Sequence, residues 1–350
     1  MSINTKYLKN NTQDIITASE ILKSGGIVAI PTETVYGLAA DMYNTQAVDK
    51  IFQAKNRPND NPLIVHICDI NQVYNLTNDF CVQAQELVKK YWPGPLTIIL
   101  NKKKSVPNNI TGNLDSVAIR FPAHKTAQEI IKHTGVPLVA PSANSSGKPS
   151  PTSFEHVLHD LDHKIDAILD GGTCDIGLES TVISFLEKTP RLLRPGFITQ
   201  ENIQSIIPEI IIDNSVYSKL DNNQKVISPG TKYKHYAPKS PVILINSSTE
   251  NYVNFINQKY NQDQNILAMC FDEDLKHIKN NIKYISYGPE NNFETQSRNL
   301  FKILRDTENI DISEIYVHIN NNINNNFCDL KTAVYNRLVR AAGFNIINLI

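Results

Sequence analysis

The sequence predicts an α/β protein with two domains. Short apolar runs rich in β-branched residues, such as 27–30, 63–67 and 96–100, alternate with longer stretches whose apolar residues recur at helical spacing. The chain has 350 residues, which is more than one hydrophobic core usually serves. Several of the apolar runs also end directly in hydroxyl, amide or cationic side chains. We therefore expect two α/β units, the first carrying polar groups at its strand ends.

The first domain is expected to occupy residues 1–212. Its expected helices bury apolar faces and lie at 12–23, 45–55, 79–91, 152–161 and 199–207. Its expected strands lie at 27–30, 63–67, 96–100, 116–120, 138–140, 167–170, 179–183 and 191–194. Thr152 and Glu155 have the spacing of a capping box at the start of a helix. Arg191 and Arg194 are three residues apart, which predicts that they lie on opposite faces of their strand.

The rest of the chain is expected to form a linker at 213–240 and a smaller α/β domain at 241–350. Strands at 242–245, 266–270, 282–287 and 315–318 alternate with helices at 249–258, 293–304 and 331–341. This alternation is typical of a largely parallel sheet. The asparagine-rich stretch 320–326 is expected to be a solvated connector. No catalytic constellation is visible in this part of the sequence.

The composition is that of an ordinary soluble globular protein, with 41% hydrophobic and 20% charged residues. A net charge of −1 provides no global field for nucleic acid, so any anion site must be local. Five scattered cysteines without a CxxC pair indicate reduced thiols in the cytoplasm and argue against a zinc site. No apolar run approaches the roughly 20 residues that span a bilayer, and the N-terminus lacks the apolar region of a secretory signal.

The stretch 27–39, IVAIPTETVYGLA, is the densest of the polar strand ends. Pro31 ends the strand because proline cannot donate to a sheet ladder, and Thr32, Glu33 and Thr34 follow at once. Polar groups in this position either face a ligand or cap their own loop. The stretch alone leaves both interpretations open.

Three cations and a histidine stand at further element ends. Lys55 and Arg57 follow a helix, where cations are favourable in any case, and His66 interrupts the apolar face of the next strand as a core residue or a functional one. Arg120 ends another strand, and a buried guanidinium needs an anionic partner. That partner is either an internal carboxylate or a bound carboxylate or phosphate.

Two later segments add small polar groups and aromatic residues. Residues 138–151 lead from a strand through PSANSSGKPSP into a helix, whose N-terminus can seat a phosphate. Neither GxxxxGK[ST] nor GxGxxG occurs in the chain. Residues 228–238, SPGTKYKHYAP, interleave tyrosines with basic residues and are expected to close over something anionic and planar. Together the strand ends suit a triphosphate nucleotide and a second small acid.

Eight motifs in order carry a family resemblance. They are PTETVYGLA, KNRPNDNPL, WPGPLT, VAIRFP, APSANSSGKPSPT, ESTVI, LLRPG and SPGTKYKHYAP. Together they resemble the threonylcarbamoyl-AMP synthases, the YrdC-like family, in its longer two-domain branch. The resemblance covers 12–239 and rests on position and α/β pattern over 241–350. It implies a twisted YrdC-like α/β sheet with a concave basic cavity, and a smaller Rossmann-like α/β domain.

The resemblance also implies a reaction and its site. L-Threonine, bicarbonate and ATP would give L-threonylcarbamoyladenylate and pyrophosphate, and Mg²⁺ would be carried by the phosphates. L-Threonine would be surrounded by Thr34, His66, Arg120, Ala140 (through its backbone) and Ser180. ATP would be held by Lys55, Arg57, Asn61, Ser116, Ser142, Asn144, Ser150 and Arg194, with His235 and Tyr236 in a segment that covers the nucleotide. No general base and no metal ligand is assigned.

The implied product serves tRNA threonylcarbamoyladenosine modification, through a separate transferase complex, and tRNA itself is a further candidate partner. Two other functions remain open. One is RNA binding without catalysis, against which the net charge of −1 counts. The other is carbamoyl transfer of the hydrogenase-maturation type, whose chains carry zinc-finger and acylphosphatase regions. The absence of CxxC from this sequence counts against that type.

Overall fold

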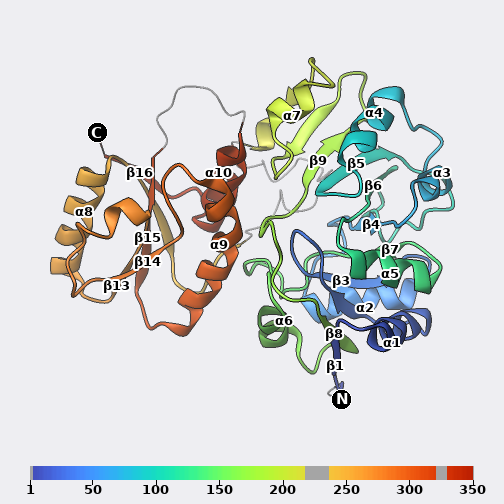
Figure 1. Ribbon diagram of the computed structural model, residues 1–350, viewed down its shortest axis with the longest axis horizontal. Helices are drawn as coiled ribbons and strands as arrows, with labels where there is room; N and C mark the ends of the chain where they lie inside the picture. The colour runs from blue at the N-terminus through green and yellow to red at the C-terminus, as the bar shows by residue number, and fades with distance from the viewer. Residues whose placement is uncertain (1–2, 217–235, 321–328, 350) are drawn as a thin grey trace. The chain divides into compact units, whose positions relative to one another are not determined.

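The structure, a computed structural model, describes residues 3–216, 236–320 and 329–349. The chain divides into two compact units. Unit 1 comprises Met1–Ser146 and Ser150–Lys232, and unit 2 comprises Gly147–Pro149 and Tyr233–Ile350. Each unit combines a β-sheet with α-helices (Figure 1), so the predicted fold class is confirmed.

Unit 1 is built on a mixed sheet that contains eleven strands of the described residues. Their order is β1-β8-β2-β3-β7-β4-β6-β5-β9-β10-β11. The strands are β1 (Lys6–Lys9), β2 (Val28–Ile30), β3 (Gly37–Asp41), β4 (Ile64–His66), β5 (Leu96–Asn101), β6 (Ser116–Arg120), β7 (Leu138–Val139), β8 (Ala167–Asp170), β9 (Thr181–Ser184), β10 (Arg191–Arg194) and β11 (Ile211–Ile212). The helices are α1 (Thr12–Lys23), α2 (Thr45–Lys55), α3 (Val73–Leu76), α4 (Val82–Tyr91), α5 (Lys125–Thr134), α6 (Phe154–Leu161) and α7 (Gln200–Gln204).

The strands around β6 carry different residues on their two faces. Val65, Ile98 and Ile119 belong to the main core, which also includes apolar residues of α2, α4 and α6. Ile64 and Ala118, one position away on the same strands, belong to a small separate cluster together with residues of β5, β9 and β10. Because side chains alternate along a strand, the two clusters mark opposite faces. We call the face of the small cluster the second face of the sheet.

Several local expectations require correction. The helix expected at 79–91 begins only at Val82, with Cys81 as its N-cap. The capping box predicted for Thr152 and Glu155 is wrong, because α6 begins after Ser153. The Thr152 hydroxyl instead lies 3.3 Å from Nδ1 of His156. Six further strands and α-helices were not predicted, namely β1, β3, α3, α5, β11 and, in unit 2, β16 (Ile346–Asn348).

Unit 2 contains a five-stranded parallel sheet in the order β14-β13-β15-β12-β16. The other strands are β12 (Val242–Asn246), β13 (Ile266–Cys270), β14 (Lys283–Ser286) and β15 (Glu314–Ile319). Helix α8 (Thr249–Gln262) covers one face of the sheet, and α9 (Phe293–Asp306) and α10 (Leu330–Ala341) cover the other (Figure 1). The predicted parallel sheet of the second domain is confirmed.

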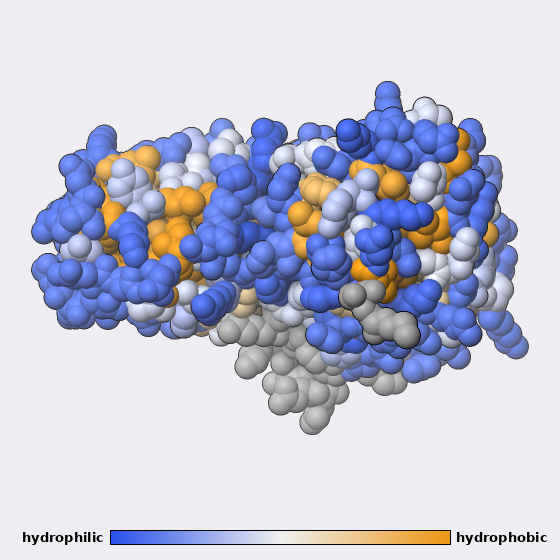
Figure 2. Space-filling model, turned by 90° about the horizontal axis from the view of Figure 1, so that it is seen from below, coloured by the Kyte–Doolittle hydropathy of each residue, from blue (hydrophilic) through white to orange (hydrophobic). Residues whose placement is uncertain are grey.

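The visible surface is mostly hydrophilic and is interrupted by smaller hydrophobic areas (Figure 2). Large exposed apolar or aromatic side chains occur at separate places in the chain, for example Tyr7, Tyr74, Val82 and Tyr284. Among the residues that the structure describes, no helix is long and apolar enough to cross a membrane.

Candidate active site

A row of side chains crosses five strands of unit 1. The strand pairings set His66 of β4 beside Arg120 of β6, and Arg120 beside Thr97 of β5. They continue from Thr97 to Val182 of β9 and from Val182 to Arg194 of β10. Neighbouring strands lie about 5 Å apart, and paired residues point to the same side of a sheet. The row therefore brings two arginines, a histidine and a threonine together on the second face.

Arg120 has an internal carboxylate as partner, one of the two options that the sequence left open. Its Nη2 donates to Oε1 of Glu33 at 2.7 Å, and both side chains are buried. Burial acts to raise the pKa of Glu33, but the charge of Arg120 and its hydrogen bond outweigh this effect and hold the pKa below its ordinary value. Nε of Arg120 and Oε2 of Glu33 have no hydrogen-bond partner. The pair therefore retains one donor and one acceptor for a ligand.

His66 is neutral at physiological pH. Burial, and then the charge of Arg120, lower its pKa to about 3. Its Nδ1 lies 3.1 Å from the carbonyl oxygen of Ile64, which can only accept, so Nδ1 carries the proton. Nε2 is then left as a hydrogen-bond acceptor. Such a ring can receive an N–H or O–H from a ligand but is too weak a base to remove a proton from an ammonium group.

A hydroxyl pair continues from this row. Oγ1 of Thr97 lies 2.7 Å from Oγ of Ser180, and both residues are fully buried. Arg194 donates from Nε to the Ser180 carbonyl at 2.9 Å and from Nη2 to the Ser180 hydroxyl at 3.0 Å. The guanidinium thus fixes both the backbone and the side chain of Ser180.

The expectation that Arg191 and Arg194 lie on opposite faces of β10 is wrong. Arg191 pairs with Ser184 and Arg194 pairs with Val182, and the register shifts between Leu192 and Arg194. The irregularity adds one residue to β10, so two residues of that strand oppose one of β9. Both arginines consequently point to the same side of the sheet.

The loop after β2 is partly capped by its own hydroxyls, the second interpretation that the sequence allowed. The hydroxyl of Thr32 donates to the carbonyl of Val35 at 2.6 Å and lies 2.9 Å from the hydroxyl of Thr34. Thr34 itself is fully buried. Ala140, directly after β7, donates its backbone N–H to the Ile64 carbonyl at 3.1 Å. This bond ties the residue after β7 to β4, the strand that ends in His66.

A second polar cluster surrounds Lys55 at the end of α2. Its Nζ donates to the backbone carbonyls of Ser142 and Asn144, each at 2.5 Å. The hydroxyl of Ser142 in turn donates to Oδ1 of Asn144 at 2.6 Å. Because the ammonium contacts two loop carbonyls, Lys55 holds residues 142–144 against the end of α2. The left-handed conformation of Asn56, with φ 50°, ends the helix at this point.

The other predicted nucleotide ligands lie in two more places. Arg57 donates from Nη2 to the carbonyl of Pro62 at 3.1 Å, inside the loop that leads into β4. Asn61 and Ser116 are buried, and Ser116 stands at the opposite end of β6 from Arg120, about 13 Å along the strand. Ser150 donates its hydroxyl to Oε1 of Glu179 at 2.5 Å.

The tip of the serine-rich loop and one aromatic candidate belong to unit 2. In that unit the carbonyl of Gly147 accepts from Ala237, and the carbonyl of Pro149 accepts from Arg305 at 2.5 Å. The ring of Tyr236 is buried, with its centroid 5.0 Å from that of Phe301. His235, the other candidate of this segment, lies outside the described residues.

Sequence reasoning left three residues of these clusters without a role. Glu33 and Glu179 stand inside recognised motifs, and their partners Arg120 and Ser150 lie far away in the chain. Thr97 lies within the apolar run LTIIL, where a threonine is explained by its preference for β-strands alone. Thr97 stands two residues before Ile99, so both side chains point to the second face, and this spacing could have identified Thr97.

Comparison with known proteins gives the family. A family model for Sua5, YciO and YrdC, described as "Telomere recombination", matches residues 20–196. A second model, "Threonylcarbamoyl-AMP synthase, C-terminal domain", matches residues 198–343. The chain belongs to the threonylcarbamoyl-AMP synthase family. The predicted family is thereby confirmed over both halves of the chain.

Relatives cover nearly the whole chain. It is 42% identical over 346 residues to threonylcarbamoyl-AMP synthase of Bacillus subtilis, covering 98% of this chain and 97% of the relative. It is 42% identical over 338 residues to the Pyrococcus abyssi protein of the same name, covering 95% of each. A crystal structure of P. abyssi Sua5 complexed with L-threonine matches with a TM-score of 0.89, at 38% identity and 99% coverage of both chains.

Proposed function

We propose that this protein is an L-threonylcarbamoyladenylate synthase, a nucleotidyltransferase that joins L-threonine, bicarbonate and ATP and releases pyrophosphate. The observation that carries the proposal is the buried row of His66, Arg120 and Thr97, with Ser180 and Arg194 beside it. The row combines a cation that has an unmet donor with hydroxyls and a neutral imidazole. This chemistry suits an amino acid that bears a carboxylate, an amine and a hydroxyl. The likeness to a fold solved with L-threonine supports the same assignment.

L-Threonine is proposed to bind along this row. Arg120 holds the carboxylate, using the Nε donor that Glu33 leaves unpaired. His66 accepts a hydrogen bond from the amine through Nε2, and Ser180 and Thr34 contact the hydroxyl. The backbone of Ala140 completes the set. A buried hydroxyl pair such as Thr97–Ser180 discriminates strongly against a substrate without the threonine hydroxyl, because its polar atoms would then lose a partner.

ATP is proposed to be held by the basic and amide groups of the surrounding loops. Arg57, Asn61, Ser116 and Ser150 contact the nucleotide, and Arg194 adds positive charge at the end of the row. Lys55 orients the loop that carries Ser142 and Asn144 through their two carbonyls, and these side chains are proposed to contact the phosphates. The segment of His235 and Tyr236 covers the nucleotide. In this division of labour residues 1–212 are catalytic, 213–240 form the cover and 241–350 form the Rossmann-like domain.

Two bond-forming steps follow from this arrangement. The neutral threonine amine attacks the carbon of bicarbonate or CO₂ and becomes a carbamate. With bicarbonate the amine proton leaves with the expelled hydroxide as water, and with CO₂ it passes to the solvent. A carbamate oxygen then attacks the α-phosphorus of ATP, and the bond from that phosphorus to the bridging oxygen breaks to release pyrophosphate. Both steps depend on positioning and on charge stabilisation more than on a protein nucleophile. The pKa of His66, about 3, favours a hydrogen-bonding role over that of general base.

Mg²⁺ would be carried by the ATP phosphates and would neutralise charge on them. The described residues contain no group of three or more histidine, cysteine, aspartate or glutamate side chains that could hold an ion by themselves. A separate transferase complex is proposed to pass the threonylcarbamoyl group to tRNA. Binding of tRNA to this chain itself belongs to the same proposal.

The proposal is tested by incubating the protein with ATP, Mg²⁺, L-threonine and ¹⁴C-bicarbonate. We expect pyrophosphate release that requires both L-threonine and bicarbonate, and a labelled adenylate of the expected mass. L-2-Aminobutyrate is the matched control, because it differs from threonine only by lacking the hydroxyl. Nucleotide turnover without L-threonine, or turnover that needs carbamoyl phosphate, would refute the synthase assignment. Binding of RNA without any turnover would do the same.

A further inference from the structure

The parallel sheet of unit 2 has a topological switch point between β13 and β15. These strands are neighbours, and their following connections run in opposite directions. The chain leaves β13 toward the outer strand β14, whereas it leaves β15 through α10 and passes β12 to reach β16. In open α/β sheets, ligands bind outside the carboxyl ends of the strands at such a point. The topology therefore indicates a candidate ligand site at the carboxyl ends of β13 and β15.

A pocket of about 130 Å³ lies at that place. Phe271 follows directly after β13, Tyr287 follows β14, Ile319 ends β15 and Asn320 follows it. The other lining residues come from the start of α9, from α10 and from the turn before α9; they are Glu290, Asn291, Phe293, Gln296, Lys331, Val334, Tyr335 and Leu338. A cavity of this volume accommodates one planar ring system but not a whole nucleoside triphosphate. All of its lining residues belong to unit 2, so it is separate from the substrate row of unit 1.

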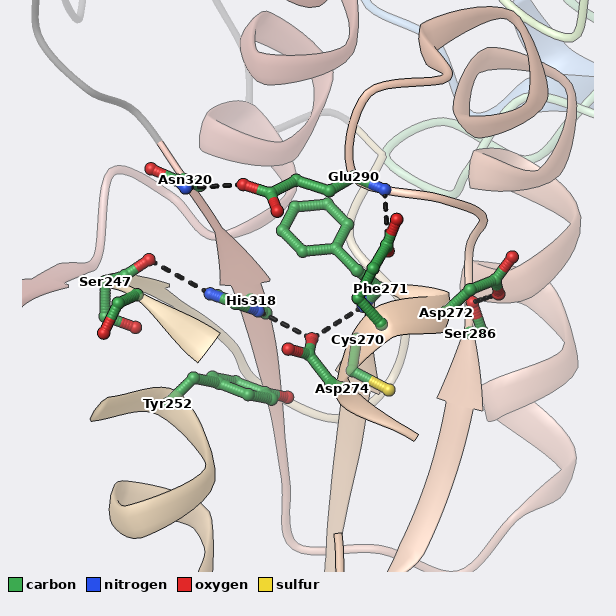
Figure 3. A network of polar contacts seen from close by, with 12 residues as sticks. Ser247, Tyr252, Cys270, Phe271, Asp272, Asp274, Ser286, Glu290, His318 and Asn320 are labelled. Atoms are coloured by element: carbon green, nitrogen blue, oxygen red, sulfur yellow. Dashed lines mark hydrogen bonds and ion pairs between the residues drawn. The ribbon is translucent and has the colours of Figure 1, made fainter. Parts of the chain in front are cut away.

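The floor of the pocket is held by a buried polar network (Figure 3). Oδ2 of Asp274 lies 2.6 Å from Nδ1 of His318 and accepts the backbone N–H of Phe271 at 2.9 Å. The hydroxyl of Tyr287 donates to the His318 carbonyl at 2.7 Å. Asp274, His318 and Tyr287 are almost fully buried. The two aromatic residues of the floor, Phe271 and Tyr287, are thereby fixed before any ligand arrives, which reduces the entropic cost of binding.

The turn between β14 and α9 is also fixed by a close approach. Gly288 has φ +127°, which L side chains rarely adopt. A Cβ at this position would lie 2.8 Å from Cγ2 of Thr295 in the first turn of α9. The backbone therefore packs directly against the start of the helix, and this positions Glu290 at the edge of the pocket.

One edge of the pocket is rich in acceptors. Nδ2 of Asn320 donates to Oε1 of Glu290 at 2.5 Å (Figure 3). This bond leaves Oε2 of Glu290 and Oδ1 of Asn320 as neighbouring acceptors. Two adjacent acceptors, one of them charged, match a planar ring that presents two adjacent N–H donors. Lys331, whose Nζ lies 6.0 Å from the centre of the Phe293 ring, supplies a cation on the α10 side.

We propose that this pocket binds the guanine base of a guanosine nucleotide. Guanine offers N1–H and the exocyclic amine to Glu290 and Asn320, while the rings of Phe271 and Tyr287 provide an aromatic floor. Adenine cannot satisfy this edge, because its ring nitrogen there is an acceptor and would face the carboxylate. Lys331, in the first turn of α10, lines the pocket and supplies a positive charge that favours the phosphate of the nucleotide. This proposal is independent of the synthase activity assigned to unit 1.

Methyl NMR of the full chain tests the proposal with three nucleotides. GMP, IMP and AMP are titrated into protein labelled at isoleucine, leucine and valine methyl groups. Saturable shifts at Ile319, Val334 and Leu338 report unit 2, whereas Ile64, Ile99 and Val182 report the second face of unit 1. We expect GMP to shift the unit 2 methyl groups at lower concentration than IMP, which lacks the exocyclic amine, by about tenfold. AMP should leave these three groups unshifted.

The matched variants are Glu290→Gln and Glu294→Gln. Both remove one charge at the start of α9, but Glu294 is exposed and does not line the pocket. Glu290→Gln is expected to weaken GMP binding at least tenfold, with Glu294→Gln unchanged and both methyl spectra otherwise native. Lys331→Ala gives a second variant at the rim, expected to weaken GMP more than guanosine. Absence of saturable shifts in unit 2 at millimolar GMP, equal response to AMP, or GMP binding that survives Glu290→Gln would each overturn the proposal.

Discussion

Among the described residues, each unit buries a pair of charged or chargeable side chains at a strand end, Arg120–Glu33 and His318–Asp274, and the two pairs differ in whether the basic partner keeps an unmet hydrogen-bond donor. In unit 1, Arg120 and Glu33 share one 2.7 Å bond, while Nε of the first and Oε2 of the second have no partner. In unit 2, both ring nitrogens of His318 are engaged, Nδ1 by Asp274 and Nε2 by the Ser247 carbonyl, and only Oδ1 of the carboxylate Asp274 has no partner. Buried polar atoms are rarely left unpaired without a reason.

The side chains around the two pairs also differ, because one pair packs against an aromatic ring and the other lies beside polar groups. The ring of His318 stacks on Tyr252, with the centroids 4.3 Å apart and the planes within 6°. Arg120 instead continues into a row of hydroxyl and cationic side chains. We infer that the His318 pair is structural and that the Arg120 pair is arranged around a ligand. The unmet donor of Arg120 and its polar neighbours, more than burial or charge, separate the two roles.

The strongest test removes Arg120. Arg120→Ala leaves the carboxylate of Glu33 buried without a counter-charge, which should lower the free energy of unfolding by about 3–5 kcal/mol. Threonine-dependent turnover should fall at the same time, because the carboxylate of the substrate loses its cation. Urea denaturation followed by the fluorescence of Trp92, the only tryptophan, measures the first effect, and steady-state kinetics measure the second.

A double variant separates the two effects. Arg120→Met combined with Glu33→Gln removes both charges, so most of the lost stability should return. Threonine use should stay impaired if Arg120 binds the substrate. Normal KM for threonine in this double variant would make the pair structural, like its counterpart in unit 2, and would end the distinction drawn between them.

Asp274→Ala is the corresponding change in unit 2. It removes the partner of His318 Nδ1 and the acceptor of the Phe271 N–H together, so unit 2 should lose about 3 kcal/mol of stability. Hydrogen exchange of the amides of β13 and β15 measures this loss. Asp272→Ala, two residues away and exposed, is the control and should cost less than about 1 kcal/mol. Equal costs for the two variants would contradict a structural role for the buried pair.

Most elements could be predicted from local pattern, because helical spacing and apolar runs are local signals. The strand β3 was missed since GLAAD contains no β-branched residue, and β11 is only two residues long. Helix α5 does carry the signal, with Ala127, Ile130 and Ile131 buried at helical spacing. This helix was therefore predictable from the sequence, although it was not among the expected elements.

The site was predictable only as a set of strand ends. Which residues become neighbours depends on register, and register is not local. Glu33 and Arg120 are 87 residues apart, and no spacing rule connects them. The irregularity in β10 reversed the expected side of Arg194 relative to Arg191, because one extra residue changes the alternation. The row of His66, Arg120 and Thr97 likewise exists only once three strands are paired.

The pH dependence of stability tests whether His66 is buried neutral. Its pKa is about 3 in the folded protein and near 6.5 in the unfolded chain. Between these values the unfolded state binds a proton that the folded state does not, so stability falls as pH decreases. The slope contributed by His66 is at most about 1.4 kcal/mol per pH unit. The pKa of Glu33 is lowered in the folded protein, so the stability that this carboxylate contributes is lost only below its ordinary pKa of 4.5.

Urea denaturation between pH 6.5 and 5 therefore isolates the histidine from Glu33. His66→Gln should show a shallower loss of stability over this interval than the parent protein, since all other titrating groups are common to both. Parallel curves would mean that His66 is solvated or charged in the folded state. The assignment of Nε2 as an acceptor for the threonine amine would then fail with it.

The smallest expected effect comes from Thr97→Val, which removes the hydroxyl that faces Ser180. One buried hydrogen bond is lost, so the free energy of unfolding should fall by about 1 kcal/mol. Thr134→Val is matched in chemistry and cost, because the Thr134 hydroxyl donates to the Ile130 carbonyl in α5, away from the row. Only Thr97→Val should also raise the KM for threonine, by up to about tenfold, because Ser180 loses one of the two partners that orient its hydroxyl and keeps only Arg194. Equal losses of stability without a change in this KM would make the hydroxyl pair part of the packing of the sheet. Arg120 and its neighbour His66 would then be the residues of the row that face the ligand.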